Sequence, residues 1–260
     1  MKAILSCTDN SLYDFFLPIA VHSWNKIGVE CIVFVPENTS ERFKIAQRYC
    51  SNTTEFHTLD IAPDREVTYF QVVRLLGCCL DLPEDEVLIT SDVDMAVFGQ
   101  YLKTYIANNV MIFGSDLTPA SQYPMCYASA TVRDWRRIMN TYGKAYQTKL
   151  GELLDDIQCE NMRGNHWSKD QDLLKQNVDN GVVPIIHMTR AHKGTQFATR
   201  RCDRDGWNPM QRDLVDAHLP RPAYEENNFK KIVELFQIQY PNDNFAWMTE
   251  YKNKYNEANR

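Results

Sequence analysis

The sequence predicts an α/β fold: a mixed, mainly parallel sheet flanked by helices, with a helical appendage at the C-terminal end. Short strand-like runs alternate with helical periodicity through the first half of the chain, which is typical of a parallel sheet with helices on both faces. Residues 31–35 form a continuous apolar run, as buried parallel strands do. The 260 residues, of which 44% are hydrophobic, suit one large domain.

In the first half, each element follows from its own local pattern. Short apolar runs predict strands at residues 2–6, 31–35, 55–59 and 87–90. Apolar residues that recur every three or four positions predict helices at residues 11–27, 40–49 and 64–80. Gly28 is a natural end for the first helix, and Pro36 is a natural end for the second strand.

The second half of the chain is less regular. Strands are expected at residues 110–114 and 182–187, and helices at residues 131–142, 170–177, 225–239 and 244–256. Pro220 and Pro222 mark a boundary before the last two helices. We therefore expect one domain over residues 1–219 and a helical extension over residues 220–260 that packs on it.

The composition argues against several classes of protein. Lys and Arg total 28 against 34 Asp and Glu, a net charge of −6, so the basic footprint of a nucleic-acid-binding protein is missing. There is no run of about twenty apolar residues, so no membrane span is expected. The eight cysteines include no CxxC pair, and the first residues turn polar too early for a signal peptide. We expect reduced thiols, a cytoplasmic location, and a chain that could be one piece of a longer multidomain protein.

Two aspartates follow the strand at residues 87–90. Asp92 and Asp94 are one residue apart, so in an extended segment their side chains lie on the same face. Two neighbouring carboxylates repel each other, and a divalent cation between them removes that repulsion. Oxygen ligands of this kind suit Mg²⁺ or Mn²⁺. The alternative is a pair of solvated loop aspartates, since the pattern is short and common.

A histidine ends the apolar run at residues 182–187. A neutral imidazole from His187 would complete a mixed site with the two aspartates, which favours Mn²⁺ over Mg²⁺. Lys193 follows six residues later and could reach a phosphate held by the same metal. The alternative for His187 is a structural histidine with an ordinary hydrogen bond.

Two further groups are candidates for the reacting centre. Asp170 and Gln171 open a helix, where one of them could lie at the reacting centre with Asp172 in support, or Asp170 could simply cap the helix. Arg74 is the one charged residue between positions 67 and 80 of the apolar helix expected at residues 64–80. It could pair with phosphates or hold Asp92 in place, or it could be a surface arginine that keeps its charge in water.

Taken in order, these segments resemble the GT-A glycosyltransferases. The likeness rests on the strand and DxD motif at residues 87–94, the DQDLL segment at residues 170–174, and the spacing from Ile185-Ile186-His187 to Lys193. It is closest to the retaining, glycogenin-like galactosyl- and glucosyltransferases. The resemblance implies a GT-A, Rossmann-like sheet and a hexose transfer, with retention, from a UDP-sugar to a hydroxyl of an oligosaccharide or glycoprotein acceptor.

The same resemblance assigns roles to individual residues. Mn²⁺, or Mg²⁺ in its place, would bridge the diphosphate of the donor, and Asp170 and Gln171 would border the donor sugar and the reaction centre. If the reaction inverted the sugar's configuration instead, Asp170 would be the general base. The metal would be bound by Asp92, Asp94 and His187; the diphosphate would contact Lys193; and the uracil and ribose would be held by Cys7, Thr8, Asp9 and Asn10.

Two rival functions remain open at this point. A phosphohydrolase of the haloacid-dehalogenase type also places DxD after a strand, with Asp92 as nucleophile and Asp94 as acid or base, but that family carries the motif on its first strand. A non-catalytic module that binds nucleotide sugars or carbohydrates is the other rival. It would stack sugar rings on aromatic side chains such as Trp167, Trp207 and Tyr123.

Overall fold

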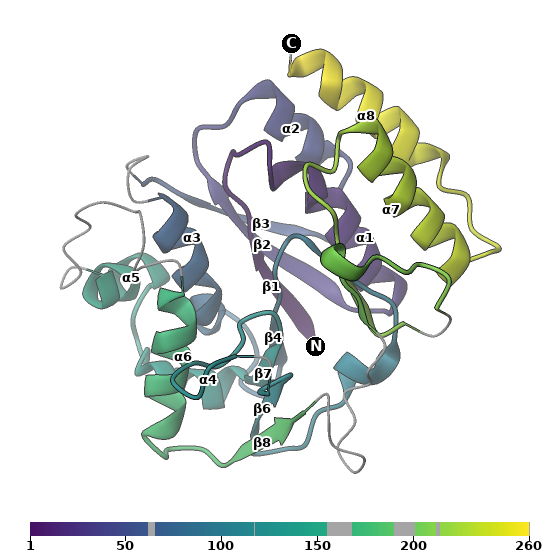
Figure 1. The fold of residues 1–260 in the computed structure, drawn as a ribbon. Coiled ribbons are helices and arrows are strands. Elements are labelled where there is room, and N and C mark those ends of the chain that lie inside the picture. Colours follow the sequence, from purple (N-terminus) through teal and green to yellow (C-terminus); the bar gives the residue numbers. More distant parts are fainter. Residues whose placement is uncertain (62–65, 117, 155–167, 190–200, 212–213, 260) are drawn as a thin grey trace.

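The computed structural model describes residues 1–61, 66–116, 118–154, 168–189, 201–211 and 214–259. Within them, a seven-stranded sheet runs in the order β3-β2-β1-β4-β7-β6-β8 between two layers of helices (Figure 1). Its strands are β1 Lys2–Ser6, β2 Glu30–Pro36, β3 Glu55–Leu59, β4 Val87–Thr90, β6 Val110–Phe113, β7 Ala128–Thr131 and β8 Ile185–Met188. The strands expected in the first half are confirmed.

The sheet reverses its order beside β1. This strand pairs in parallel with β2 on one side, where Ala3 lies opposite Cys31, and with β4 on the other, where Ala3 lies opposite Ile89. Only β7 runs antiparallel to its neighbours β4 and β6. In open α/β sheets ligands bind outside the carboxyl ends of the strands at such a switch point, which here lies between β1 and β4.

Two hydrophobic cores lie on the two faces of the sheet. One is built by α1, α2, α7 and α8 around Trp24 and Tyr251, and the other by α3, α4, α5 and α6 around Trp135 and Leu174. The helices are α1 Leu17–Lys26, α2 Glu41–Arg48, α3 Glu66–Val73, α4 Val132–Met139, α5 Tyr146–Leu154, α6 Lys169–Asp179, α7 Glu226–Gln239 and α8 Ala246–Ala258. Short 3₁₀ turns are η1 Asp14–Phe16, η2 Arg74–Cys79, η3 Gln100–Lys103 and η4 Arg204–Gly206.

The expected helix at residues 64–80 changes type partway along. Within the described residues it is α-helical to Val73 and continues as the 3₁₀ turn η2. Gly77 in this turn lies so close to β1 that an added Cβ would stand 2.9 Å from the Cδ1 atom of Ile4. The tighter turn therefore lets the chain pack directly on the sheet, and it fixes Arg74 at the junction of the two helical types.

A second, three-stranded sheet was not expected from the sequence. It has the order β5-β10-β9 and consists of β5 Met95–Val97, β10 Asp216–His218 and β9 Arg201–Cys202. Strand β10 runs antiparallel to β5, with His218 opposite Met95. Because β5 begins directly after the DxD aspartates, this pairing carries residues from the far end of the chain to that motif.

Helices α7 and α8, in the segment expected to be an extension, lie over α1 and α2 (Figure 1). Phe236 of α7 and Tyr251 of α8 are fully buried in the same core as Trp24 of α1. Among the described residues, none of the helices combines the length and the apolar character needed to cross a bilayer.

Candidate functional site

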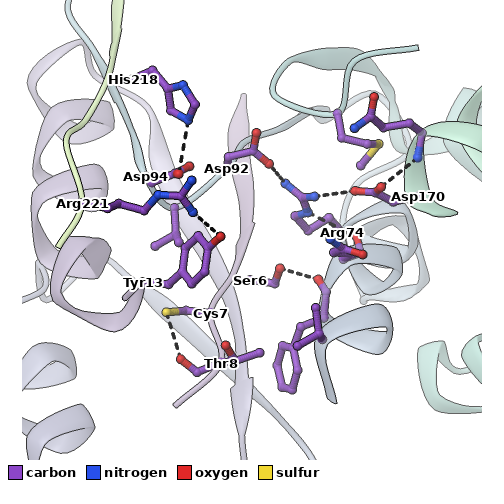
Figure 2. A pocket seen from close by; sticks show the side chains of 16 residues that line it. Ser6, Cys7, Thr8, Tyr13, Arg74, Asp92, Asp94, Asp170, His218 and Arg221 are labelled. Carbon is purple, nitrogen blue, oxygen red and sulfur yellow. Dashed lines mark hydrogen bonds and ion pairs between the residues drawn. The ribbon is translucent and has the colours of Figure 1, made fainter. Parts of the chain in front are cut away.

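A cavity of about 290 Å³ opens at the carboxyl ends of β1 and β4 (Figure 2). Most of the residues that line it have polar side chains, and they come from segments that are far apart in the sequence. Cys7 and Thr8 follow β1, and Asp92 and Asp94 follow β4. The other polar contributors include Tyr13, Gln71, Arg74, Asp170, Gln171, His218 and Arg221. The cavity therefore lies at the switch point of the sheet.

Arg74 links one DxD aspartate to the start of α6. Its side chain is almost fully buried, and its Nη1 atom pairs with Asp92 while its Nη2 atom donates to Asp170 at 2.6 Å (Figure 2). Its Nε atom also donates to the backbone carbonyl of Gln71 at 3.2 Å, and Nη1 donates to that of Ser91 at 3.1 Å. Arg74 is thus a guanidinium shared by two carboxylates; one reading of the sequence expected the pair with Asp92 but not the pair with Asp170.

Asp170 is a buried residue that lines the cavity. Asp170 is 2% exposed, and its second carboxylate oxygen accepts the backbone N–H of Gln171 at 2.8 Å. Burial raises the pKa of Asp170 to about 6, although the charge of Arg74 opposes that shift. The negative charge of Asp92 adds to the effect of burial and raises the pKa of Asp170 further.

Asp94 faces the other way, toward the second sheet. Its Oδ2 atom accepts from Nη2 of Arg204 at 2.6 Å and lies 3.3 Å from Nε2 of His218. Burial lowers the pKa of His218, so the imidazole favours its neutral form. The backbone supports this arrangement, since the N–H of Leu219 donates to the carbonyl of Asp94 at 2.9 Å.

The structure divides the predicted nucleotide loop. Cys7 and Thr8 line the cavity, whereas Asp9 and Asn10 are not among the lining residues. The carboxylate of Asp9 is bound by the hydroxyl of Ser40 at 2.8 Å and by Nη2 of Arg42 at 2.6 Å. Asp9 therefore fastens the loop to α2, because its oxygens are already engaged away from the cavity.

The predicted metal histidine needs a correction. His187 is exposed on β8, next to the ring of Tyr123 at 5.4 Å, and it does not line the cavity. Strand β8 is at the edge of the sheet beyond β6 and β7, so its end lies away from β4. The imidazole beside Asp94 belongs to His218 instead. Lys193, the predicted phosphate contact, lies outside the described residues.

Sequence reasoning also missed a cation on the cavity wall. Arg221 lines the cavity, with its guanidinium carbon 5.0 Å from the ring centre of Tyr13 and a hydrogen bond to the phenol oxygen (Figure 2). The sequence signal was a basic residue before a proline, three positions after His218. We interpreted that proline-rich segment only as a domain boundary.

The donor set suits a hard divalent cation, but its present geometry is that of ion pairs. Asp92, Asp94 and His218 all line the one cavity and offer two carboxylates and an imidazole. In the part of the chain that the structure describes, no three His, Cys, Asp or Glu side chains converge as metal ligands do. Arg74 and Arg204 hold the two carboxylates on opposite sides. The chemistry of Asp92, Asp94 and His218 fits the Mn²⁺ that the sequence predicted, provided that the two aspartates exchange their arginine partners for the metal.

The architecture has counterparts among solved structures. One is the galactosyltransferase LgtC in complex with donor and acceptor sugar analogues, with a TM-score of 0.53 and 14% sequence identity, covering 96% of this chain and 100% of that one. Another is an active-site mutant of LgtC, with a TM-score of 0.52 and 12% identity over 92% and 100% of the two chains. No protein-family model matches the sequence, and no curated protein does either. The chain has the GT-A fold.

The GT-A fold also bears on the rival phosphohydrolase. In this GT-A chain the DxD motif follows β4, the central strand between β1 and β7, and not the first strand. Ser91, just before the motif, accepts a hydrogen bond from the indole of Trp24 at 3.0 Å, and its N–H donates to the carbonyl of Ile4 at 2.9 Å. The motif is therefore anchored to β1 and α1 before its aspartates enter the cavity.

Proposed function

We propose that this protein is a metal-dependent glycosyltransferase that moves a hexose from a UDP-sugar to a hydroxyl group of a glycan acceptor, with retention of configuration. Galactose is the favoured sugar and glucose the second choice, because LgtC is a galactosyltransferase. The observation that carries the proposal is the GT-A cavity in which both DxD aspartates, one imidazole and two arginines meet. A cytoplasmic location remains part of this proposal.

The charges of the cavity suit a nucleotide diphosphate. Asp92, Asp94 and His218 would hold Mn²⁺, which when bound supplies the positive charge that stabilises the departing diphosphate. Arg221 stands on the same wall, oriented by the face of Tyr13, and would contact the diphosphate in the role predicted for Lys193. Cys7 and Thr8 would lie against the nucleoside at the end of β1.

The reaction centre would lie at the start of α6. Gln171 lines the cavity there, and it would orient the donor sugar through its amide. Asp170 has one oxygen on Arg74 and the other on the Gln171 N–H, so it acts best as the group that positions both. A carboxylate engaged in this way is a poor general base, which favours retention, where the leaving phosphate takes the proton of the acceptor hydroxyl.

The direct test is a UDP-release assay with Mn²⁺ across a panel of UDP-sugars. We expect UDP release from one donor, slow when water alone takes the sugar and faster when an oligosaccharide acceptor takes it, and NMR of the transfer product would give an anomeric centre of unchanged configuration. Release of inorganic phosphate from a phosphosugar would point to the phosphohydrolase. Binding of UDP-sugar without any release would point to the non-catalytic module.

A further inference from the structure

The two DxD aspartates are each paired with an arginine, but the two arginines are anchored very differently. Arg74 has a partner for each of its three nitrogens. Arg204 donates through Nη2 to Asp94, while its Nε and Nη1 atoms are buried without a hydrogen-bond partner in the described part of the chain. A buried guanidinium with unsatisfied donors loses much of the benefit of its ion pair.

A third arginine shows what a structural pair looks like in this chain. Arg42 donates to Asp14 at 2.8 Å, to Asn259 at 3.1 Å and to Asp9 at 2.6 Å, so all its nitrogens are used. Arg204, in the short turn η4, lacks this network: within the described residues its one hydrogen bond is to the carboxylate of Asp94. Releasing Arg204 therefore breaks one hydrogen bond, whereas releasing Arg74 breaks four and releasing Arg42 breaks three.

The arginines also set the charge that an arriving cation meets. Among the described residues, three carboxylates line the cavity: Asp92, Asp94 and Asp170. Three guanidiniums pair with them or share the cavity, those of Arg74, Arg204 and Arg221. These guanidiniums offset the three lining carboxylates, with Asp203 beside the other nitrogen of His218 as a further acidic group. A free divalent cation therefore gains less net attraction than the carboxylates alone would give, whereas a cation that already carries a diphosphate brings its own negative charge.

We propose that Arg204 is a removable counter-ion for Asp94, and that the divalent cation consequently enters this site together with the nucleotide diphosphate and binds only weakly before it. The inference rests on the proposed function. It assigns to Arg204 a positioning role: it keeps the motif charge-balanced in the absence of donor, and it yields Asp94 when the metal and the diphosphate arrive.

The test is a titration of Mn²⁺ followed by the electron paramagnetic resonance of the free ion, with and without UDP. For the wild-type protein we expect UDP to tighten Mn²⁺ binding by about tenfold or more, because the diphosphate adds negative charge beside the ion. Without nucleotide, Arg204→Gln should bind Mn²⁺ about tenfold more tightly than wild type, since one nearby positive charge is gone. Arg204→Lys is the matched control and should behave as wild type does.

Equal Mn²⁺ affinity with and without UDP would overturn the binding order, and weaker or unchanged Mn²⁺ binding by Arg204→Gln would overturn the role of Arg204. The wild-type comparison needs no variant, so it decides the order even if Arg204→Gln fails to fold. If UDP binds under no condition, the proposed function fails, while the comparison of the two proteins with Mn²⁺ alone still decides the role of Arg204.

Discussion

At the scale of single residues, Asp94 is the side chain on which nucleotide binding should depend most. It is nearly buried between Arg204 and His218, so Asp94→Asn keeps its shape but removes the charge that a metal requires. We expect Mn²⁺-dependent UDP binding to disappear in calorimetry while the melting curve stays cooperative. Asp172→Asn, on the first turn of α6, is the control and should bind UDP normally. Unchanged UDP affinity in Asp94→Asn would contradict the metal site.

Arg221 should distinguish the phosphates from the nucleoside. It is a cation on the cavity wall whose orientation comes from the ring of Tyr13, and a diphosphate is the part of the donor that needs it. Arg221→Gln is expected to weaken UDP about tenfold or more and uridine much less, since a charge-assisted contact contributes about 1.5–3 kcal/mol. Calorimetric titrations with both ligands measure the difference. Equal losses for UDP and uridine would remove the diphosphate role.

Asp170 should make the free energy of unfolding depend on pH. Its folded pKa of about 6 lies above the ordinary value of 3.8, so the folded protein holds a proton that the unfolded chain has already lost. The free energy of unfolding should therefore fall as pH rises from about 4 to about 6 and then level off, by up to about 3 kcal/mol from this group. Asp170→Asn should flatten that part of the curve in urea unfolding at several pH values. The same pH dependence of the free energy of unfolding in both proteins would mean that Asp170 does not keep its proton in the folded state.

At the scale of elements, one hydrogen-bond network ties the last helix to the loop after β1. Tyr255 of α8 donates to the fully buried Asp14, and Arg42 of α2 joins Asp14 to Asp9. Burial raises the pKa of Asp14, so the carboxylate depends on these donors. Tyr255→Phe should lower the free energy of unfolding by about 1–3 kcal/mol in urea. Tyr142 is a half-exposed residue whose hydroxyl donates to the carbonyl of Arg133 at 3.4 Å, so Tyr142→Phe should change the free energy of unfolding little. Equal effects of the two variants would contradict the network.

Most elements that local pattern predicted are long enough to carry a period, although β7 and α5, which were not expected, are of similar length. The apolar strands β1, β2 and β4 and the helices α7 and α8 were found close to their expected bounds. Strands β5, β9 and β10 have only two or three residues each, and no periodicity can show in so short a run. They form because segments that are far apart in the sequence pair with each other, and a short stretch of sequence gives no sign of that pairing.

The same limit explains the error in the site. Asp92, Asp94, Asp170 and Arg74 were found from features around them: a strand end, a helix start and one charge in an apolar helix. His187 has the same local signature, an imidazole at the end of an apolar strand, yet its strand lies at the edge of the sheet. His218 reaches Asp94 because β10 pairs with β5. In this pairing Ala217 lies opposite Ala96, which is 121 residues away in the sequence.

At the scale of the whole molecule, the chain beyond residue 219 contributes to the same core as the first helix. Phe236 of α7 is fully buried, with ring centres of Phe98 at 5.3 Å, Phe245 at 5.6 Å and His22 at 6.3 Å. Those rings belong to the segment after β5, the start of α8 and α1. A side chain shared by three segments couples their stability, so the extension should not unfold by itself.

Phe236→Ala tests that coupling. The cavity left by the ring should lower the free energy of unfolding by about 3–5 kcal/mol, and the entire transition should shift as one, because α1 and the sheet lose packing together with α7. Far-ultraviolet circular dichroism and tryptophan fluorescence, followed in the same urea titration, would then give coincident curves. Gln237→Ala, an exposed neighbour on α7, is the control and should leave the midpoint nearly unchanged. Two separate transitions in Phe236→Ala would instead make residues 220–260 an independent unit resting on a self-sufficient domain.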